Sequence, residues 1–335
     1  MRALQISELS GPDAVRVVDA PEPELDHPLS PGEGVLIEVH AAGVSFPDVL
    51  QTRGLYQYKP DLPFVPGAEV AGVVRSAPGG ARVAEGDRVV GFTLLGGLAE
   101  RAVAPSFLTF ALPEPLDFAQ GAALLLNYHT ALFALQLRGR LRDGETVLVH
   151  GAAGGVGTAA LQVAKGLGAR TIAVVSTAAK ESVARTAGAD EVLRSDGDWR
   201  EQARELTGDG VDLILDPVGG DRFTDSLRSL REGGRLVVVG FTGGAIPEVK
   251  VNRLLLRNTE VVGAGWGAYV MPRPEVARAM GETIERMVHA GFIRPLVGAR
   301  FGLEEAGEAL KLIDGRGATG KVVLELGGVV TAGAG

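Results

Sequence analysis

Cysteine is absent from the 335-residue chain, and its absence narrows the possible chemistry. Without thiols there are no disulfides, no thiol nucleophile and no thiolate ligand of the kind that most structural zinc sites use. Histidine is scarce as well, because the chain has five, none at a spacing that suggests a metal-binding pair. We expect His129 and His150 to be packing or hydrogen-bonding residues.

Long hydrophobic runs and basic clusters are also missing. No run approaches ~20 uninterrupted apolar residues, so we expect no membrane-spanning helix. The first residues, MRALQISELSGPDAVRVV, lack the apolar stretch of a secretory signal. The net charge of -8, without a basic cluster, argues against nucleic-acid binding as the main role. We therefore expect a soluble cytoplasmic protein that binds neither nucleic acid nor membrane.

Apolar residues and glycine are abundant. Hydrophobic residues make up 46% of the chain, enough to build a full core, and 48 glycines are spread along it without a period. Residues 1–115 contain short apolar stretches such as GVLIEVHAAGV, separated by Gly and Pro, which predict a partly β, barrel-like domain. Residues 117–137 have apolar residues at helical spacing and no proline, which predicts helical structure.

From residue 146 the pattern changes to short apolar strands that alternate with helices. TVLVHG, TIAVVS, VDLILD and RLVVVGF predict strands, and the segments between them predict helices. This alternation is typical of an α/β fold with a doubly wound parallel sheet. We place this domain at residues 120–265 and expect residues 266–335 to return to the first domain, residues 1–119.

A glycine-rich turn joins the first of these strands to its helix, in VLVHGAAGGVGTAAL (147–161). The first N–H groups of a helix have no partner within the helix, and the helix dipole favours an anion there. Gly154 would let a pyrophosphate approach the backbone, and Gly157 would let the helix pack closely on the strand. Ala152 replaces the usual first glycine. The turn predicts a dinucleotide site, and a purely structural strand–helix turn is the alternative.

The end of the second strand indicates which dinucleotide binds. An NAD site usually has Asp or Glu about 20 residues on, to bind the ribose hydroxyls. This chain has Ser176 instead, followed by Lys180, in a chain with only six lysines. A hydroxyl and an ammonium suit a 2′-phosphate, so we predict NADPH rather than NADH. Arg194, near the end of the next strand, is a second candidate for the phosphate. A solvated Lys180 at a helix start is the alternative.

Several further motifs, taken in order, resemble those of the medium-chain dehydrogenase/reductase superfamily, and most closely its zinc-free NADPH:quinone oxidoreductases. The resemblance covers about residues 1–326. The motifs are AAGVSFPDVLQTRGLY (41–56), PGAEVAGVV (66–74), NYHTAL (127–132), GAAGGVG, STAAK, DPVGG (216–220), VVVGFTGG (237–244) and GKVVL (320–324). The resemblance implies a Rossmann cofactor domain at 120–265 and a GroES-like catalytic domain made of the remaining segments.

The chain departs from the zinc-using members of this superfamily. Where they have Gly-His-Glu, it has Gly67-Ala68-Glu69, and their catalytic and structural cysteines are absent. We therefore predict no metal, which disfavours alcohol oxidation because zinc stabilises the alkoxide in that reaction. We expect Glu69 to be a buried, hydrogen-bonded structural carboxylate.

The resemblance also implies which residues hold the cofactor. Together with the turn and phosphate residues above, the expected set is Ser45, Asn127, Thr130, Gly154, Gly155, Val156, Ser176, Lys180, Arg194, Val218, Gly240, Phe241 and Lys321. Ser45 stands where many relatives have Asn. NADPH would lie across the cleft between the two domains, where open α/β sheets bind ligands.

Tyr56 is the expected catalytic residue. In related enoyl reductases a tyrosine at this place is thought to help protonate the substrate, and a phenol can donate a hydrogen bond to a developing enolate. A loop tyrosine that only covers the pocket is the alternative. Asp48 and Arg53 also match family positions, and we expect them to hold this loop.

We therefore expect an NADPH-dependent, zinc-independent oxidoreductase that transfers hydride to quinones or similar conjugated carbonyl compounds. One alternative is reduction of the C=C bond of an enoyl thioester or enal. Another is an NADPH-binding protein without turnover. The resemblance implies a homodimer, and TEVVGA (259–264) would lie at the open edge of the cofactor sheet, available to pair with its twin.

Overall fold

The computed structural model describes residues 1–326, and the chain divides into two compact units. Unit 1 contains the N-terminal segment up to Leu126, and unit 2 begins at Asn127. The chain from residue 273 alternates between them, with Arg273–Gly281 and residues 295–326 in unit 1 and Glu282–Arg294 in unit 2. The boundaries expected at residues 119/120 and 265/266 remain predictions, and residues 327–335 of the expected first domain lie outside the described residues.

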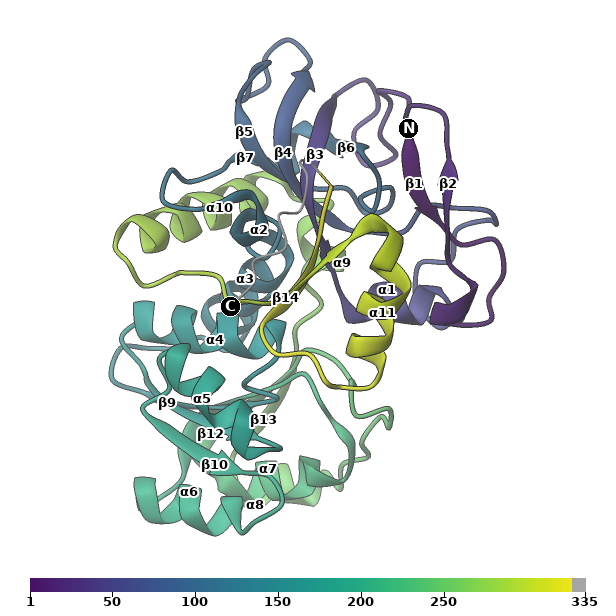
Figure 1. The fold of residues 1–335 in the computed structure, drawn as a ribbon. Helices are drawn as coiled ribbons and strands as arrows, with labels where there is room; N and C mark the ends of the chain where they lie inside the picture. Colours follow the sequence, from purple (N-terminus) through teal and green to yellow (C-terminus); the bar gives the residue numbers. More distant parts are fainter. Residues whose placement is uncertain (327–335) are drawn as a thin grey trace. The chain divides into compact units, whose positions relative to one another are not determined.

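Unit 1 is built on a mixed sheet (Figure 1). Among the described residues the order is β14-β15-β3-β4-β5-β7, and β6 pairs with β3. The strands are β3 (Gly34–Val44), β4 (Glu69–Ser76), β5 (Arg88–Phe92), β6 (Arg101–Pro105), β7 (Thr109–Ala111), β14 (Val297–Gly302) and β15 (Lys321–Glu325). Neighbouring strands are antiparallel except β14 and β15, which are parallel. The short strands expected for the first part of the chain are confirmed.

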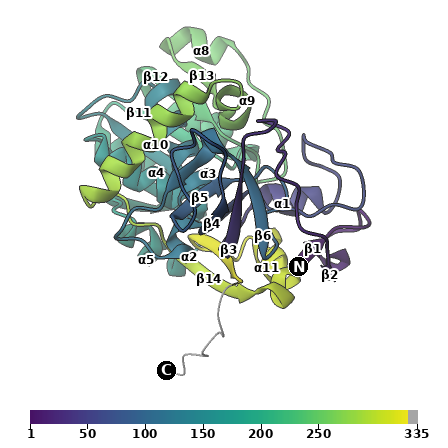
Figure 2. The same ribbon diagram turned by 90° about the horizontal axis from the view of Figure 1, so that it is seen from above.

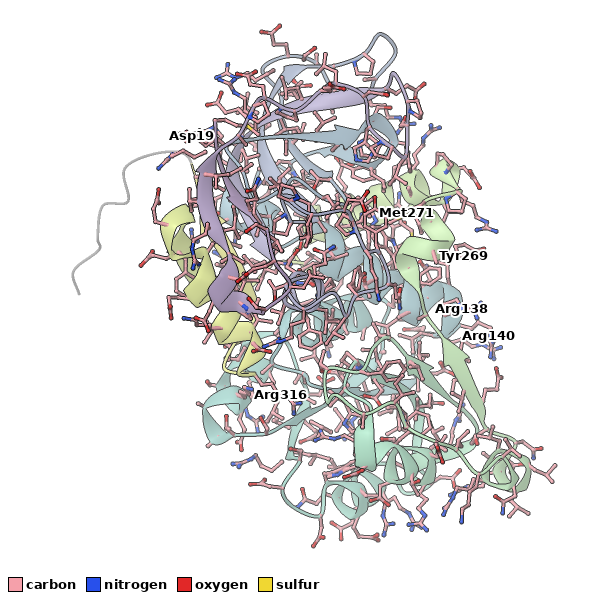
Figure 3. The ribbon with its side chains drawn as sticks, turned by 90° about the vertical axis from the view of Figure 1, so that its right-hand side faces the viewer. Asp19, Arg138, Arg140, Tyr269, Met271 and Arg316 are labelled. Carbon is pink, nitrogen blue, oxygen red and sulfur yellow. The ribbon has the colours of Figure 1, made fainter. Side chains whose placement is uncertain are left out.

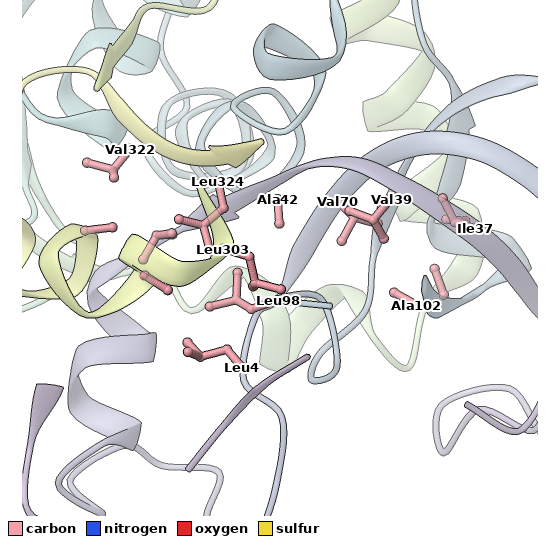
Figure 4. Packing of buried hydrophobic residues seen from close by; sticks show 14 of the residues in the cluster. Leu4, Ile37, Val39, Ala42, Val70, Leu98, Ala102, Leu303, Val322 and Leu324 are labelled. Carbon is pink, nitrogen blue, oxygen red and sulfur yellow. The ribbon is translucent and has the colours of Figure 1, made fainter. Parts of the chain in front are cut away.

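The core of unit 1 follows from the two-residue period of its strands. Along β3, Val35, Ile37 and Val39 are buried, because alternate side chains of a strand point to the same face. They belong to a cluster that includes Leu98 and Leu303, from distant parts of the chain (Figure 4). The other elements of unit 1 are β1 (Arg2–Gln5), β2 (Arg16–Asp19), α1 (Phe46–Gln51), α2 (Phe118–Gly121) and α11 (Ala306–Asp314). Helix α11 packs beside β14 and β15 (Figure 2).

Unit 2 contains a parallel sheet in the order β10-β9-β8-β11-β12-β13 among the described residues. Its strands are β8 (Thr146–His150), β9 (Arg170–Val175), β10 (Glu191–Arg194), β11 (Val211–Asp216), β12 (Leu230–Val238) and β13 (Glu260–Gly263). The order reverses between β8 and β11, as in a doubly wound nucleotide-binding fold. The helices of unit 2 are α4 (Gly155–Gly166), α5 (Ala178–Thr186), α6 (Trp199–Thr207), α7 (Phe223–Ser229), α8 (Asn252–Arg257) and α9 (Trp266–Val270). Helix α3 (Leu125–Leu132) begins in unit 1 and continues in unit 2 from Asn127, and α10 (Pro274–His289) is divided between the units after Gly281. The predicted α/β fold is confirmed.

The helical character predicted for residues 117–137 is confirmed over most of the segment, but the segment is not one regular α-helix. The segment forms α2, then α3, then a π-helical stretch η3 (Phe133–Arg138). Gly121 packs so closely on the sheet that a Cβ there would lie 2.9 Å from the Cβ of Ala71. The carboxylate of Glu69 then accepts a hydrogen bond from the N–H of Leu126 at 2.8 Å, which fixes the start of α3. The helix is interrupted between these two contacts with β4, although its apolar spacing is continuous.

None of the helices in residues 1–326 combines the length and apolarity that crossing a bilayer requires.

Candidate functional site

The glycine-rich turn of unit 2 follows β8 at the switch point of the sheet. Helix α4 begins at this turn, and no side chain caps it at Gly154. Its first N–H groups therefore remain available to an anion. A Cβ on Gly157 would lie 2.2 Å from the carbonyl oxygen of Gly151, so only glycine allows the helix to approach the strand this closely. An uncapped helix start behind a glycine turn is an arrangement that can bind an anion.

Asn127 lies against this turn. Its side chain is buried, and a Cβ on Gly155 would lie 2.6 Å from its Nδ2 atom. Thr130 lies three residues further along α3, and residues at this spacing share one face of a helix. Val156, the second residue of α4, is half-buried. The structure thus brings Asn127 to the start of α4.

The end of β9 carries the residues expected to select the nucleotide. Ser176 follows this strand and is exposed. Thr177 caps α5, and its hydroxyl accepts the N–H of Lys180 at 3.4 Å. Lys180 therefore lies in the first turn of α5, close to the strand end. The cap at Thr177 was not among the expected site residues, although a threonine before a helix is a readable signal.

Arg194 lies beside Ser176, because β10 pairs in parallel with β9. Its guanidinium donates to the carbonyl oxygen of Ser176 at 3.4 Å. It also forms ion pairs with Asp196 at 2.9 Å and Glu181 at 3.5 Å. Arg194 and Ser176 therefore form one polar corner, in which two carboxylates already contact the arginine.

The loops after β11 and β12 meet at the same edge of the sheet. The buried carboxylate of Asp216 accepts the N–H groups of Val218 and Gly219 at 2.8 and 2.9 Å, which shapes the first loop. A Cβ on Gly219 would lie 3.0 Å from the ring of Phe241, which follows Gly240 in the second loop. Sequence reasoning did not name Asp216, although it begins the DPVGG motif.

Val218 also reaches the glycine turn, since a Cβ on Gly151 would lie 3.1 Å from its Cγ2 atom. The glycine turn and the loops after β11 and β12 thus meet at the carboxyl ends of these strands. These loops carry Val218, Gly240 and Phe241, which are expected to contact the nicotinamide half of the cofactor. Open α/β sheets bind ligands at this edge.

Two histidines of unit 2 are buried. The Nε2 atom of His150 is 2.8 Å from the hydroxyl of Ser226, and its ring lies edge-on to Trp199. Burial lowers the pKa of His150 to about 4, although Asp216 opposes the shift. Burial also lowers the pKa of His129 to about 3. Both histidines are packing or hydrogen-bonding residues, as expected.

Unit 1 contains a buried charged cluster at one end of its central strands. Lys321 begins β15, Ser45 follows β3 and Glu69 begins β4, and these three strands are neighbours. The ammonium of Lys321 forms an ion pair with Glu69 and donates to the hydroxyl of Ser45 at 2.6 Å. Lys321 is 3% exposed and Glu69 is fully buried, so the expected buried structural role of Glu69 is confirmed.

Asp48 extends this cluster along α1. It is buried, and its carboxylate accepts the N–H of Ser45 at 2.7 Å and that of Gly67 at 3.1 Å. Burial raises the pKa of Asp48 to about 6, against the opposing effect of these hydrogen bonds and of Lys321. Its predicted role in holding the loop is confirmed by these bonds.

Tyr56 follows α1 and is half-buried. Burial, and to a smaller extent the charge of Asp48, raises the pKa of its phenol above the usual value. The phenol therefore stays protonated at neutral pH and can donate a hydrogen bond. Arg53, in the same segment, forms an ion pair with Asp314 at 2.7 Å.

Within residues 1–326, no cluster of three or more acidic or histidine side chains is arranged to hold a metal ion.

Comparison with known proteins gives consistent matches over most of the chain. Residues 31–114 match the model of the alcohol dehydrogenase GroES-like domain, and residues 155–285 match that of the zinc-binding dehydrogenases. Quinone oxidoreductase-like protein 2 of Bos taurus is 38% identical over 330 residues, which cover 97% of this chain and 92% of that protein.

Solved structures agree with this assignment. A probable oxidoreductase from Mycobacterium abscessus is 44% identical with a TM-score of 0.88, covering 97% of this chain and 98% of that one. The quinone oxidoreductase of Thermus thermophilus, solved also in complex with NADPH, is 35% identical with a TM-score of 0.84, covering 97% of this chain and 100% of that one.

Proposed function

Because the chain belongs to the quinone oxidoreductase family of the medium-chain dehydrogenases/reductases, we propose that this oxidoreductase reduces quinones or similar conjugated carbonyl compounds with NADPH. The observation that carries the proposal is the uncapped start of α4 at the switch point, with a polar corner at the end of β9. The NADPH complex of the Thermus thermophilus relative supports it.

We assign different residues of unit 2 to different parts of the cofactor. The start of α4, from Gly154 to Val156, would hold the pyrophosphate. Ser176, Lys180 and Arg194 would hold the 2′-phosphate. The residues proposed for the nicotinamide half are Asn127, Thr130, Val218, Gly240 and Phe241. When bound, NADPH supplies a hydride, which together with one proton reduces a quinone to a hydroquinone and leaves NADP⁺.

Cofactor binding is the first test of this function. We expect Lys180→Ala to weaken NADPH binding by about 1–3 kcal/mol, roughly 5- to 150-fold, because it removes a charge-assisted contact. NADH binding should be unchanged. Fluorescence titration with both nucleotides measures this. Lys165→Ala is a matched control, because Lys165 pairs with Asp190 on the surface of the same unit.

An acceptor panel then tests the activity. Oxidation of NADPH with several quinones and enones would support the proposal. Tight NADPH binding without turnover on any acceptor would instead support the non-catalytic alternative. If neither nucleotide binds, the glycine turn is only a structural turn and the enzyme function fails.

A second candidate reaction is reduction of the C=C bond of an enoyl thioester or enal. The observation that favours it is Tyr56, a half-buried phenol that stays protonated at neutral pH and can donate a hydrogen bond to a developing enolate. In that case Tyr56→Phe should reduce enone or enoyl-thioester turnover much more than quinone turnover. Equal losses on both classes would count against a proton-donor role for this residue.

We also propose a homodimer formed through the cofactor sheet. Strand β13 is at the edge of that sheet, as predicted, and an open edge needs a partner or cover. The carbonyl of its last residue, Gly263, accepts a hydrogen bond from Arg138, and Arg140 pairs with Glu260. Figure 3 labels the two arginines. Nearby α8 exposes Leu255 and other apolar side chains. Sedimentation showing only monomer at micromolar concentration would contradict this assembly. A cytoplasmic location also stays a prediction.

A further inference from the structure

Lys321 determines which role the hydroxyl of Ser45 plays in the hydrogen bond between them. An ammonium has donors and no acceptor, so the oxygen of Ser45 accepts in the 2.6 Å contact between them. The hydroxyl proton of Ser45 must then point to a different acceptor. Among the described residues of unit 1, no atom accepts it.

The ammonium is held firmly in this position. Lys321 is buried and paired with Glu69, whose other oxygen accepts the N–H of Leu126. Gly43 makes the arrangement possible, because a Cβ there would lie 2.7 Å from Cε of Lys321 and 2.8 Å from Cγ of Glu69. If the ammonium moved away, the buried carboxylate of Glu69 would be left uncompensated, which favours the paired position.

Ser45 is half-buried, whereas Lys321 is almost fully buried. The hydroxyl can therefore reach a ligand that the ammonium cannot. Tyr56 lies in the same segment, and Asp48 accepts the backbone N–H of Ser45. Burial, and to a smaller extent the charge of Asp48, raises the pKa of Tyr56, so its protonated phenol is a second hydroxyl donor in this segment.

We propose that the Ser45 hydroxyl, held by Lys321, donates a hydrogen bond to the carbonyl oxygen of the conjugated acceptor. This bond stabilises the negative charge that develops on that oxygen as the hydride is accepted. Ser45 is then a catalytic residue, while Lys321 and Glu69 are positioning residues that act through it. This assignment replaces the expected cofactor contact at Ser45, and it rests on the proposed function.

The kinetic test compares substitutions that remove or keep a donor. Ser45→Ala should lower kcat by about 10- to 100-fold, at or below the lower end of what one oxyanion donor contributes, because a quinone is easily reduced. The loss should be larger for electron-rich benzoquinones, which are harder to reduce, than for electron-poor ones. Ser45→Asn keeps an N–H donor and an oxygen that accepts from Lys321, so it should retain most of the activity. Ser10→Ala, on an exposed serine of the same unit, is the matched control.

A spectroscopic test needs no turnover. The infrared carbonyl stretch of naphthoquinone is measured in the presence of saturating NADP⁺, which cannot donate a hydride. We expect a lower frequency with wild type and Ser45→Asn than with Ser45→Ala. An unchanged frequency in wild type, relative to free naphthoquinone, would overturn the assignment.

The outcomes separate this assignment from the proposed function. If wild type neither binds NADPH nor reduces quinones, both fail. If wild type is active and Ser45→Ala matches it in kcat and carbonyl frequency, only the Ser45 assignment fails. If Ser45→Ala loses NADPH affinity in proportion to activity and Ser45→Asn does not restore kcat, Ser45 serves the cofactor or the fold instead.

Discussion

A Cβ placed on Gly155 would lie 2.6 Å from the Nδ2 atom of Asn127. A side chain at position 155 and the present position of the Asn127 amide therefore exclude each other. Both residues belong to unit 2, where α3 brings Asn127 to the first turn of α4. The glycine here is required by one neighbouring side chain, whereas the glycine at 157 is required by the backbone of the turn.

This contact predicts that the effect of Gly155→Ala on stability depends on whether the Asn127 side chain is present. Gly155→Ala should destabilise the protein, because the new methyl group must displace the Asn127 amide. In an Asn127→Ala background the same substitution should stabilise it by up to about 1 kcal/mol, since alanine is the better helix former. Urea unfolding of the four proteins in a double-mutant cycle measures the coupling. A stabilising Gly155→Ala in the wild-type background would contradict the predicted clash.

The buried carboxyl of Asp48 predicts a stability that falls as pH rises. Its pKa is raised from an ordinary value of 3.8 to about 6, so between these values the folded state binds more protons than the unfolded chain. The stabilisation is fully present below about pH 4 and is lost as pH rises through about 6, up to about 3 kcal/mol. Asp48→Asn lacks this titration. We expect the unfolding free energy of wild type, relative to Asp48→Asn, to decrease from about pH 4 to pH 7, measured by urea unfolding. A pH-independent difference would show that Asp48 stays ionised.

The parallel sheet and its glycine turn were predictable from the sequence because their signals are local. Each buried strand is a short apolar run, and Gly154 and Gly157 stand at fixed positions between strand and helix. The break in the helix predicted over 117–137 was not predictable in the same way. It depends on Glu69, which is distant in sequence and caps α3 with its carboxylate.

The charged cluster of unit 1 was also not predictable from local sequence, because its residues are distant from one another in the chain. Lys321 and Ser45 are separated by 276 positions, so no local pattern indicates their hydrogen bond. Each could be matched to a family motif, but their partnership depends on the pairing of β15 with β3. Motif comparison identified both residues, and only the fold shows that they act on each other.

At Gly43, the addition of a single methyl group should strongly reduce the stability of the protein. A Cβ there would lie 2.3 Å from the carbonyl oxygen of Ala122 and would also press on Lys321. Because the first neighbour is backbone, Gly43→Ala should destabilise the protein by about 1–3 kcal/mol. Gly79→Ala is the matched control, since nothing lies within 4 Å of its Cβ position. Thermal and urea unfolding compare the two, and equal stabilities would refute the predicted overpacking.

His150 predicts a loss of stability in acid. Burial, aided by Arg222 and opposed by Asp216, lowers its pKa from 6.5 to about 4. Between these values the unfolded chain binds a proton that the folded state does not, so this stabilisation is present above about pH 6.5 and is lost as pH falls towards 4. The loss is up to about 3 kcal/mol. His150→Asn should flatten this part of the stability curve, whereas His289→Asn, at an exposed position, should not. Urea unfolding from about pH 7 to pH 4 distinguishes them, and parallel curves for wild type and His150→Asn would mean that another group governs the acid sensitivity.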